Sequence, residues 1–206
     1  MTRPSLRDRC PVRGRPTNVR ERLLEAAREE LVEVGPGRVS LRSIARRVGV
    51  SHQAVSHYFS SRSALFEQIA VDGLHELEQR LRDTLERTVG RDDEEVVAAL
   101  GAVYIECAAA EPGIFDLMFG SGTGLVDPHV APVALARQQV WQLLLDTVKD
   151  AVARGWGGGA PAEVLALTSW STVHGFAVLS REGIGPDLGP VAVEDLLRQS
   201  LSAIRR

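Results

Sequence analysis

Residues 40–65 read SLRSIARRVGVSHQAVSHYFSSRSAL, and this stretch decides the fold of the N-terminal part of the chain. Its first half carries apolar side chains at helical spacing, and Ser40 is a suitable N-cap for that segment. Gly49 supplies the positive φ that a tight turn requires. Ser51 then caps a second short helix, expected over 52–59. Two short helices joined by a glycine turn predict a helix-turn-helix.

The second short helix has an apolar side and a polar side. Val55 and either Tyr58 or Phe59 are available to pack inward. The opposite side carries His52 and Gln53, followed one turn later by a second polar pair, Ser56 and His57. Polar side chains on such a helix reach base edges in the major groove. We therefore expect this helix to read DNA sequence.

The residues before the motif divide into a helix and an arm. From Asn18 onward, leucine, alanine and valine recur at helical spacing until Gly35-Pro36-Gly37 ends the helix. Residues 1–17 lack this periodicity and carry five Arg and three Pro, which is typical of a mobile basic arm. The arm is either a disordered start or a segment whose Arg13 and Arg15 enter an adjacent minor groove.

Charge is distributed unevenly along the chain. Residues 1–63 hold 13 arginines and 6 carboxylates, a net charge of +7. The remainder holds 11 basic and 21 acidic residues, a net charge of −10. A basic first third on an acidic body is typical of a nucleic-acid-binding module joined to a domain that does not bind DNA.

The rest of the chain predicts further helices. A long helix begins near Arg62, and no segment alternates with the period of two that a strand requires. The later helices are expected over 93–110, 112–119, 133–154, 161–181 and 191–205. The fold class is therefore all-α. We expect three parts: an arm over 1–17, a helix-turn-helix domain over 18–64, and a regulatory and dimerisation domain over 65–206.

The motif resembles the DNA-binding domain of the tetracycline-repressor (TetR) family. The matching residues are Ser40, Ile44-Ala45, Gly49-Val50-Ser51, Tyr58-Phe59 and the basic Arg62. The resemblance implies an N-terminal three-helix domain that a long helix joins to a helical-bundle domain for ligand binding and dimerisation. Family members usually carry Lys where this chain has Arg62. They usually carry a backbone-contacting Tyr where it has Ser56, so that contact is expected to move to His57 or Tyr58.

The resemblance also implies which residues meet DNA. Phosphate would be bound by Arg62, Ser40 and Tyr58, and these contacts would fix the position of the domain along the DNA. Arg46 and Arg47 are either a solvated face or further phosphate contacts. The full set of expected DNA contacts is Arg13, Arg15, Ser40, Arg42, Ser51, His52, Gln53, Ser56, His57, Tyr58 and Arg62.

A second resemblance lies in the other half of the chain. PGIFDLMF over 112–119, together with Trp170 and His174-Gly175, is similar to a C-terminal domain named for its Trp–His–Gly pattern. Trp170 and His174 share one helix face, where a core or interface pair is favoured over direct ligand contact. Residues that would line a ligand cavity, or else a simple helical core, are Tyr104, Cys107, Phe115, Met118, Phe119, Trp141, Leu145, Trp170 and His174.

Several functional classes lack support in the sequence. Gly157–Gly159 has no following Lys and Ser or Thr to complete a phosphate-binding loop. Cys10 and Cys107, the two cysteines, are too few for a disulfide framework or a metal site. No basic residue is near Cys107 in sequence, which disfavours a reactive sensor. No stretch approaches the about 18 apolar residues of a membrane span. We expect a cytoplasmic protein that is not an enzyme and has no cofactor, metal or membrane partner.

The leading hypothesis is a homodimeric repressor on a palindromic double-stranded DNA operator. The last two helices would pair with their symmetry mates, and a small apolar or amphipathic effector would release the DNA. The alternatives are an effector-independent regulator, an activator, a helical enzyme that uses His174 or a carboxylate as base, and an architectural DNA-binding protein.

Overall fold

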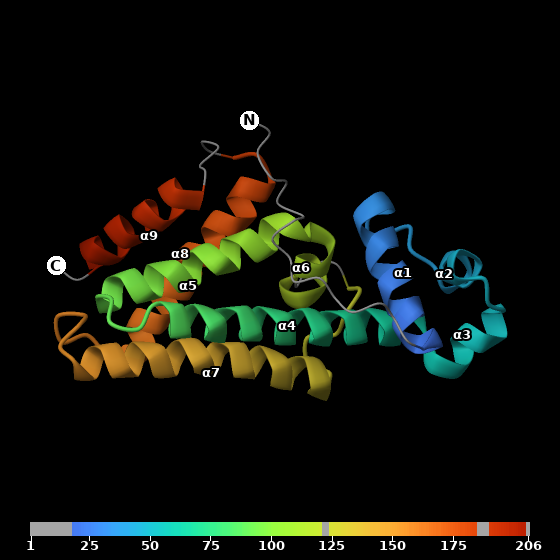
Figure 1. Cartoon of the computed structure of the whole chain (residues 1–206), viewed down its shortest axis with the longest axis horizontal. Coiled ribbons are helices and arrows are strands. Elements are labelled where there is room, and N and C mark those ends of the chain that lie inside the picture. Colours follow the sequence, from blue (N-terminus) through green and yellow to red (C-terminus); the bar gives the residue numbers. More distant parts are fainter. Residues whose placement is uncertain (1–17, 121–123, 185–189, 205–206) are drawn as a thin grey trace. The chain divides into compact units, whose positions relative to one another are not determined.

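The computed structural model describes residues 18–120, 124–184 and 190–204, which form helices joined by turns (Figure 1). These ranges contain no strand, so the all-α prediction is confirmed. The helices are α1 Val19–Val34, α2 Leu41–Val48, α3 His52–Tyr58, α4 Arg62–Arg87, α5 Asp93–Ala110, α6 Pro112–Phe119, α7 Ala131–Ala153, α8 Ala162–Arg181 and α9 Pro190–Ile204.

The observed helix ends agree closely with the predicted ones. α5 and α6 begin and end at the predicted residues. α3 stops one residue early, because Phe59 has an extended backbone with φ −133° and ψ 110°. α7 begins at Ala131, before Pro132, since proline is tolerated in the first turn of a helix, where the amide hydrogen has no intrahelical partner. The end of the predicted last helix at Arg205 lies outside the described residues.

The chain forms two compact units that differ from the division expected from the sequence. The first unit comprises residues 1–73 and 110–133, and the second comprises 74–109 and 134–206. α4 therefore contributes its first turns to one unit and its remainder to the other. α6 belongs to the first unit together with the helix-turn-helix.

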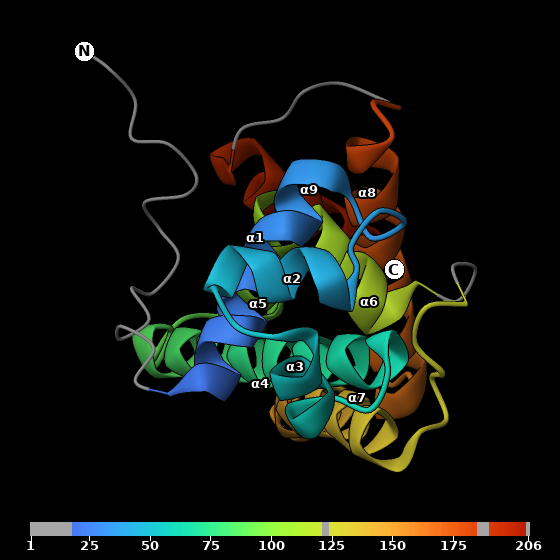
Figure 2. The same ribbon diagram turned by 90° about the vertical axis from the view of Figure 1, so that its right-hand side faces the viewer.

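The first unit is built on α1. Figures 1 and 2 show α2 beside α1, with α3 following α2, and α6 also contacts α1. The buried side chains are Leu23, Leu31, Ile44, Val55, Phe59, Leu65, Phe66 and Ile69. α4 and α6 approach closely at Gly73, where a Cβ would lie 2.9 Å from both Ile114 Cγ2 and Met118 Sδ. A larger residue at this crossing would therefore force the Ile114 and Met118 side chains to shift.

The second unit is a helical bundle of the later part of α4 with α5, α7, α8 and α9. Its buried side chains include Leu77, Ala98, Val148, Ala166 and Leu197. Among the helices of the described ranges, none is by itself long and apolar enough to cross a membrane. α5 and α6 meet that criterion only when they are counted together.

Candidate nucleic-acid interface and ligand cavity

The start of α2 is fixed by a reciprocal cap. Ser40 Oγ accepts a hydrogen bond from Ser43 N at 3.1 Å, and Ser43 Oγ accepts one from Ser40 N at 3.1 Å. Ser43 Oγ also lies 2.9 Å from the largely buried Glu30 carboxylate on α1. The cap therefore orients the first turn of α2 and attaches it to α1.

The turn after α2 satisfies its backbone groups inside the protein. Gly49 is left-handed, with φ 74° and ψ 33°, which a residue with a Cβ adopts only at a cost. Val50 N donates to Ala45 O at 3.0 Å. From α1, the Arg22 guanidinium donates to Val48 O at 2.7 Å. The Ala45 and Val48 carbonyls at the C-terminal end of α2 thus have partners, and these bonds hold the turn.

α3 presents one face to the core and the other to solvent. Ser51 Oγ caps the helix by accepting from Ala54 N at 3.1 Å. Val55 is fully buried, and Phe59 is only 3% exposed while Tyr58 is 42% exposed. Phe59 is therefore the aromatic residue that packs inward. The exposed face consists of His52, Gln53, Ser56, His57 and Tyr58.

Most of the expected DNA contacts are exposed in the described residues. Ser40 and Arg42 are exposed at the start of α2, and Ser51 is exposed at the turn directly before the exposed face of α3. Arg13 and Arg15 lie outside the described residues. The caps and the turn that the sequence indicated therefore position this surface.

Arg62 has a different environment from the other expected contacts. It is half-buried, and its guanidinium donates to the Pro36 carbonyl. The same group lies over the Phe66 ring, with Cζ 5.0 Å from the ring centroid. In this structure Arg62 braces the loop that follows α1. This bond uses only one of the guanidinium nitrogens, so other N–H groups of Arg62 remain as donors.

The neighbouring arginines Arg46 and Arg47 also differ. Arg47 is held by two carboxylates of α1, at 3.1 Å from Glu29 and in a closer pair with Glu33. The bond to Arg47 lowers the pKa of Glu33. Arg46 is exposed and has no ion pair with any described residue. Of these two arginines, only Arg46 keeps its charge available to an outside partner such as phosphate, because the charge of Arg47 is already paired.

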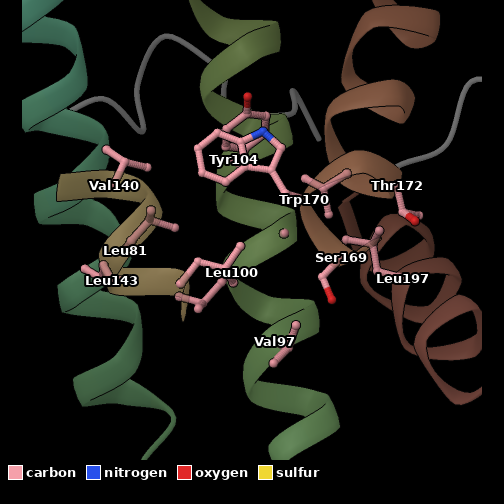
Figure 3. Close-up of a pocket in the computed structure, with 13 residues that line it drawn as sticks. Leu81, Val97, Leu100, Tyr104, Val140, Leu143, Ser169, Trp170, Thr172 and Leu197 are labelled. Carbon is pink, nitrogen blue, oxygen red and sulfur yellow. The ribbon is translucent and has the colours of Figure 1, made fainter. Parts of the chain in front are cut away.

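The second unit encloses a narrow cavity of about 40 Å³. Its walls come from α4, α5, α7, α8 and α9 (Figure 3). Most lining side chains are aliphatic, and none of those in the described residues is charged. The lining residues are Leu81, Val97, Leu100, Gly101, Tyr104, Val140, Leu143, Leu144, Ser169, Trp170, Thr172, Val173 and Leu197.

An aromatic cluster lies at one end of this cavity. Tyr104 Oη and His174 Nδ1 are 2.8 Å apart, so they share a hydrogen bond. The Tyr104 and Trp170 rings are 5.8 Å apart, as are the rings of Trp170 and Trp141. Burial raises the pKa of Tyr104. Burial, followed by the charge of Arg181, lowers the pKa of His174, which favours a neutral imidazole.

Comparison with known proteins agrees with both halves of the architecture. Residues 23–69 match the family described as bacterial regulatory proteins, tetR family. Residues 97–204, about half of the chain, match the tetracyclin repressor-like C-terminal domain. The chain belongs to the tetR family. Both resemblances to this family found in the sequence are thereby confirmed.

Individual relatives of this tetR-family chain are distant. The HTH-type transcriptional regulator Rv1816 of Mycobacterium tuberculosis is 29% identical over 103 residues, which are 50% of this chain and 44% of that protein. The chain thus matches less than half the length of this curated relative. A protein with unknown function from Rhodococcus sp. RHA1 has a TM-score of 0.80 at 28% identity, with 95% of this chain and 97% of that one covered. PfmR of Thermus thermophilus, a TetR family transcriptional regulator, has a TM-score of 0.67 at 19% identity, with 93% of this chain and 97% of that one covered. At this identity the similarity supports the fold alone.

The structure places the nine expected cavity residues of this tetR-family chain in different settings, and Cys107 is half-buried on α5, outside the lining. Tyr104 and Trp170 line the cavity, while Trp141 and His174 contact those two residues from outside the lining. Leu145 is buried on α7, outside the lining. The expected residues of α6 do not line the cavity, because α6 belongs to the first unit; they are Phe115, Met118 and Phe119.

Two features of the second unit were missed from the sequence. Cys107 does have a basic neighbour, because Arg80 Nη1 on α4 lies 2.8 Å from its Sγ. Ser169 lines the cavity, but a serine within an apolar helix carries no signal that separates a cavity wall from a packed core. Both features depend on contacts between helices that are distant in sequence.

Proposed function

We propose that this tetR-family chain is a sequence-specific DNA-binding transcriptional regulator that acts in the cytoplasm. The observation that carries the proposal is the exposed polar face of α3. Its His52, Gln53, Ser56 and His57 project from a helix-turn-helix whose caps and turn are satisfied internally. Such a face is suited to hydrogen bonds with base edges in the major groove.

Contacts to phosphate are proposed to surround this reading face. Ser40, Ser51 and Tyr58 offer exposed hydroxyl groups, and Arg42 and Arg46 offer exposed charge. The arm would add Arg13 and Arg15 in an adjacent minor groove. Arg62 would brace the loop at Pro36 and would offer phosphate the guanidinium N–H groups that the Pro36 carbonyl does not use.

We propose a homodimer formed through α8 and α9. The exposed side of α8 carries Val164, Leu167 and Leu179, and α9 exposes Leu196. Apolar side chains gathered on the outside of a helical bundle favour burial against another chain. A second copy related by a two-fold axis would bury them in a four-helix interface and pair two reading helices with a palindromic operator.

The regulatory step proposed for the dimer is release from DNA by a small effector. The apolar cavity of the second unit is the site that supports it. An effector acts only through a difference in affinity between the DNA-competent and DNA-incompetent states. The role proposed is therefore repression that the effector relieves. An activator, or a regulator without an effector, is the alternative.

The experiment that tests the proposal is selection from a random duplex library, with the full-length chain at near-physiological salt. Enrichment of an inverted repeat is expected. Enrichment of a single half-site would contradict the dimer while keeping sequence-specific binding. If a folded preparation retains DNA without any enriched motif, an architectural role replaces the one proposed.

A further inference from the structure

We infer that the effector is a compact, uncharged and mainly apolar molecule with one oxygen that hydrogen-bonds to Ser169. This inference rests on the proposed effector-controlled function and adds the chemical class of the ligand. It follows from the hydrogen-bonding state of each hydroxyl group in the cavity wall and from the volume of the cavity.

The cavity wall has little to offer a charged ligand. None of its described side chains carries a charge, so a carboxylate or an ammonium would lose its hydration without a counter-charge in the lining; Arg137, whose charge acts on Tyr104, is outside the lining. Two of its polar side chains are already engaged within the protein. Tyr104 Oη bonds to His174, and Thr172 Oγ1 donates to Thr168 O at 2.9 Å.

Ser169 is the exception among the hydroxyl groups of the wall. It is only 3% exposed, and its Oγ lacks a hydrogen-bond partner in the part of the chain that the structure describes. Figure 3 shows its side chain in the space between α5 and α8. A buried hydroxyl without a partner is costly, and such a group in a native protein requires an explanation.

Two other hydroxyl residues of α8 differ from Ser169, because their side chains do have hydrogen-bond partners. Thr168 Oγ1 donates to Val164 O at 2.7 Å, and Thr172 donates in the same way to the carbonyl four residues before it. Helical hydroxyls commonly satisfy themselves by this bond. Ser169 does not, and its hydroxyl remains available as donor or acceptor to a ligand oxygen.

The size of the cavity restricts the ligand further. About 40 Å³ is smaller than the roughly 150 Å³ of an apolar cavity that binds benzene, so even a single ring must displace part of the wall. The wall is tight at Gly101, where a Cβ would lie 2.7 Å from Leu197 Cδ1 and 2.8 Å from Val173 Cγ2. Displacement of these side chains acts on α9 and α8, the helices proposed to form the dimer.

The test compares three probes that share one ring: benzyl alcohol, toluene and benzoate. Binding to the full-length chain is followed by tryptophan fluorescence, because Trp170 lines the cavity. Ser169→Ala removes the hydroxyl. Ser180→Ala makes the same change at an exposed position near the end of the same helix, away from the side that carries Val164 and Leu167, and serves as the control. Operator binding by each preparation is measured in parallel.

We expect benzyl alcohol to bind the wild type on the order of fivefold more tightly than toluene, and benzoate not to bind. Ser169→Ala should make the alcohol and toluene bind equally well, without a decrease in melting temperature, and Ser180→Ala should keep the difference. Three outcomes would overturn the ligand class alone: tighter binding of benzoate than of the uncharged probes, equal binding of all three probes, or no binding of any probe by a preparation that binds operator. Failure of operator selection instead overturns the proposed function.

Discussion

Arg42 and Arg47 lie on the same short helix, but their surroundings are opposite. Arg42 is exposed, whereas Arg47 is paired with Glu29 and Glu33 of α1. The charge of Arg47 is therefore used to hold α2 against α1, while that of Arg42 remains available for phosphate. Gln53 on α3 carries no charge, so it can contribute to DNA binding only through hydrogen bonds and packing.

Replacing Arg42 and Gln53 one at a time should distinguish a residue that contacts phosphate from a residue that recognises bases. Arg42→Ala should weaken binding to all sequences alike and lower the slope of affinity against salt by about one unit, because one phosphate contact is lost. Gln53→Ala should instead relax preference at one or two base pairs, with a cost there of about 1–3 kcal/mol. Binding of each variant to a site library at several salt concentrations provides the measurement. Identical profiles for the two variants would show that this division is wrong.

His174 provides a prediction of pH dependence. Burial, and then Arg181, lower its pKa from the ordinary value of 6.5. Between the lowered pKa and 6.5 the unfolded chain binds a proton that the folded chain does not. The free energy of unfolding should therefore have its full value above this pH window, and it should decrease as the pH falls through the window.

Urea unfolding at about pH 7.5 and about pH 5.5, on either side of the ordinary histidine pKa, tests this prediction. His174→Gln keeps an acceptor for the Tyr104 hydroxyl but does not titrate. The variant should lose less stability than the wild type between the two pH values. Equal losses would assign the acid sensitivity to other groups.

At the scale of the element, the turn between α2 and α3 depends on backbone conformation rather than on space. Gly49 is left-handed, with φ 74°, yet a Cβ there would meet no atom within 4 Å. Gly37, in the loop after α1, is equally unobstructed, but its φ is outside the left-handed range. The two positions therefore isolate the cost of the left-handed conformation.

Gly49→Ala should lower the free energy of unfolding by about 1 kcal/mol, because alanine resists a left-handed backbone. Gly37→Ala should leave it unchanged or raise it by about 0.5 kcal/mol, since it restricts only the unfolded chain. Chemical denaturation of both variants measures the difference. Equal effects would mean that the turn relaxes to another conformation.

At the scale of the whole molecule, two exposed leucines distinguish the proposed interface from the rest of the surface. Leu167 on α8 is 59% exposed, and Leu135 on α7 is 58% exposed. Leu167 shares the outer side of α8 with Val164, whereas Leu135 is on a helix outside the proposed interface. The two residues are matched in type and exposure, so a difference between them reports on the interface.

Leu167→Glu should raise the dimer dissociation constant roughly tenfold or more, because each protomer would bring an unpaired carboxylate into the interface. Leu135→Glu should leave it unchanged. Sedimentation equilibrium measures the constant, and circular dichroism verifies that both variants are folded. If the Leu135 variant dissociates and the Leu167 variant does not, the dimer forms through another surface.

The sequence by itself determined the helices, the turn and the family. Ser40 and Ser51 act as caps, as their positions before apolar repeats indicated, and Gly49 takes the positive φ expected of it. These signals are readable because a cap or a turn is formed by residues adjacent in the chain. The reading face of α3 followed for the same reason, since a helix presents its faces at a fixed period.

Only the tertiary structure decided how side chains that are distant in sequence are engaged. It showed Arg47 paired with α1, Arg62 turned onto Pro36 and Arg80 beside Cys107. It also moved α6 out of the expected cavity and revealed Ser169 within the wall. The physical reason is that an apolar stripe specifies burial but not a partner, and a charge specifies no neighbour until packing brings one within a few ångströms.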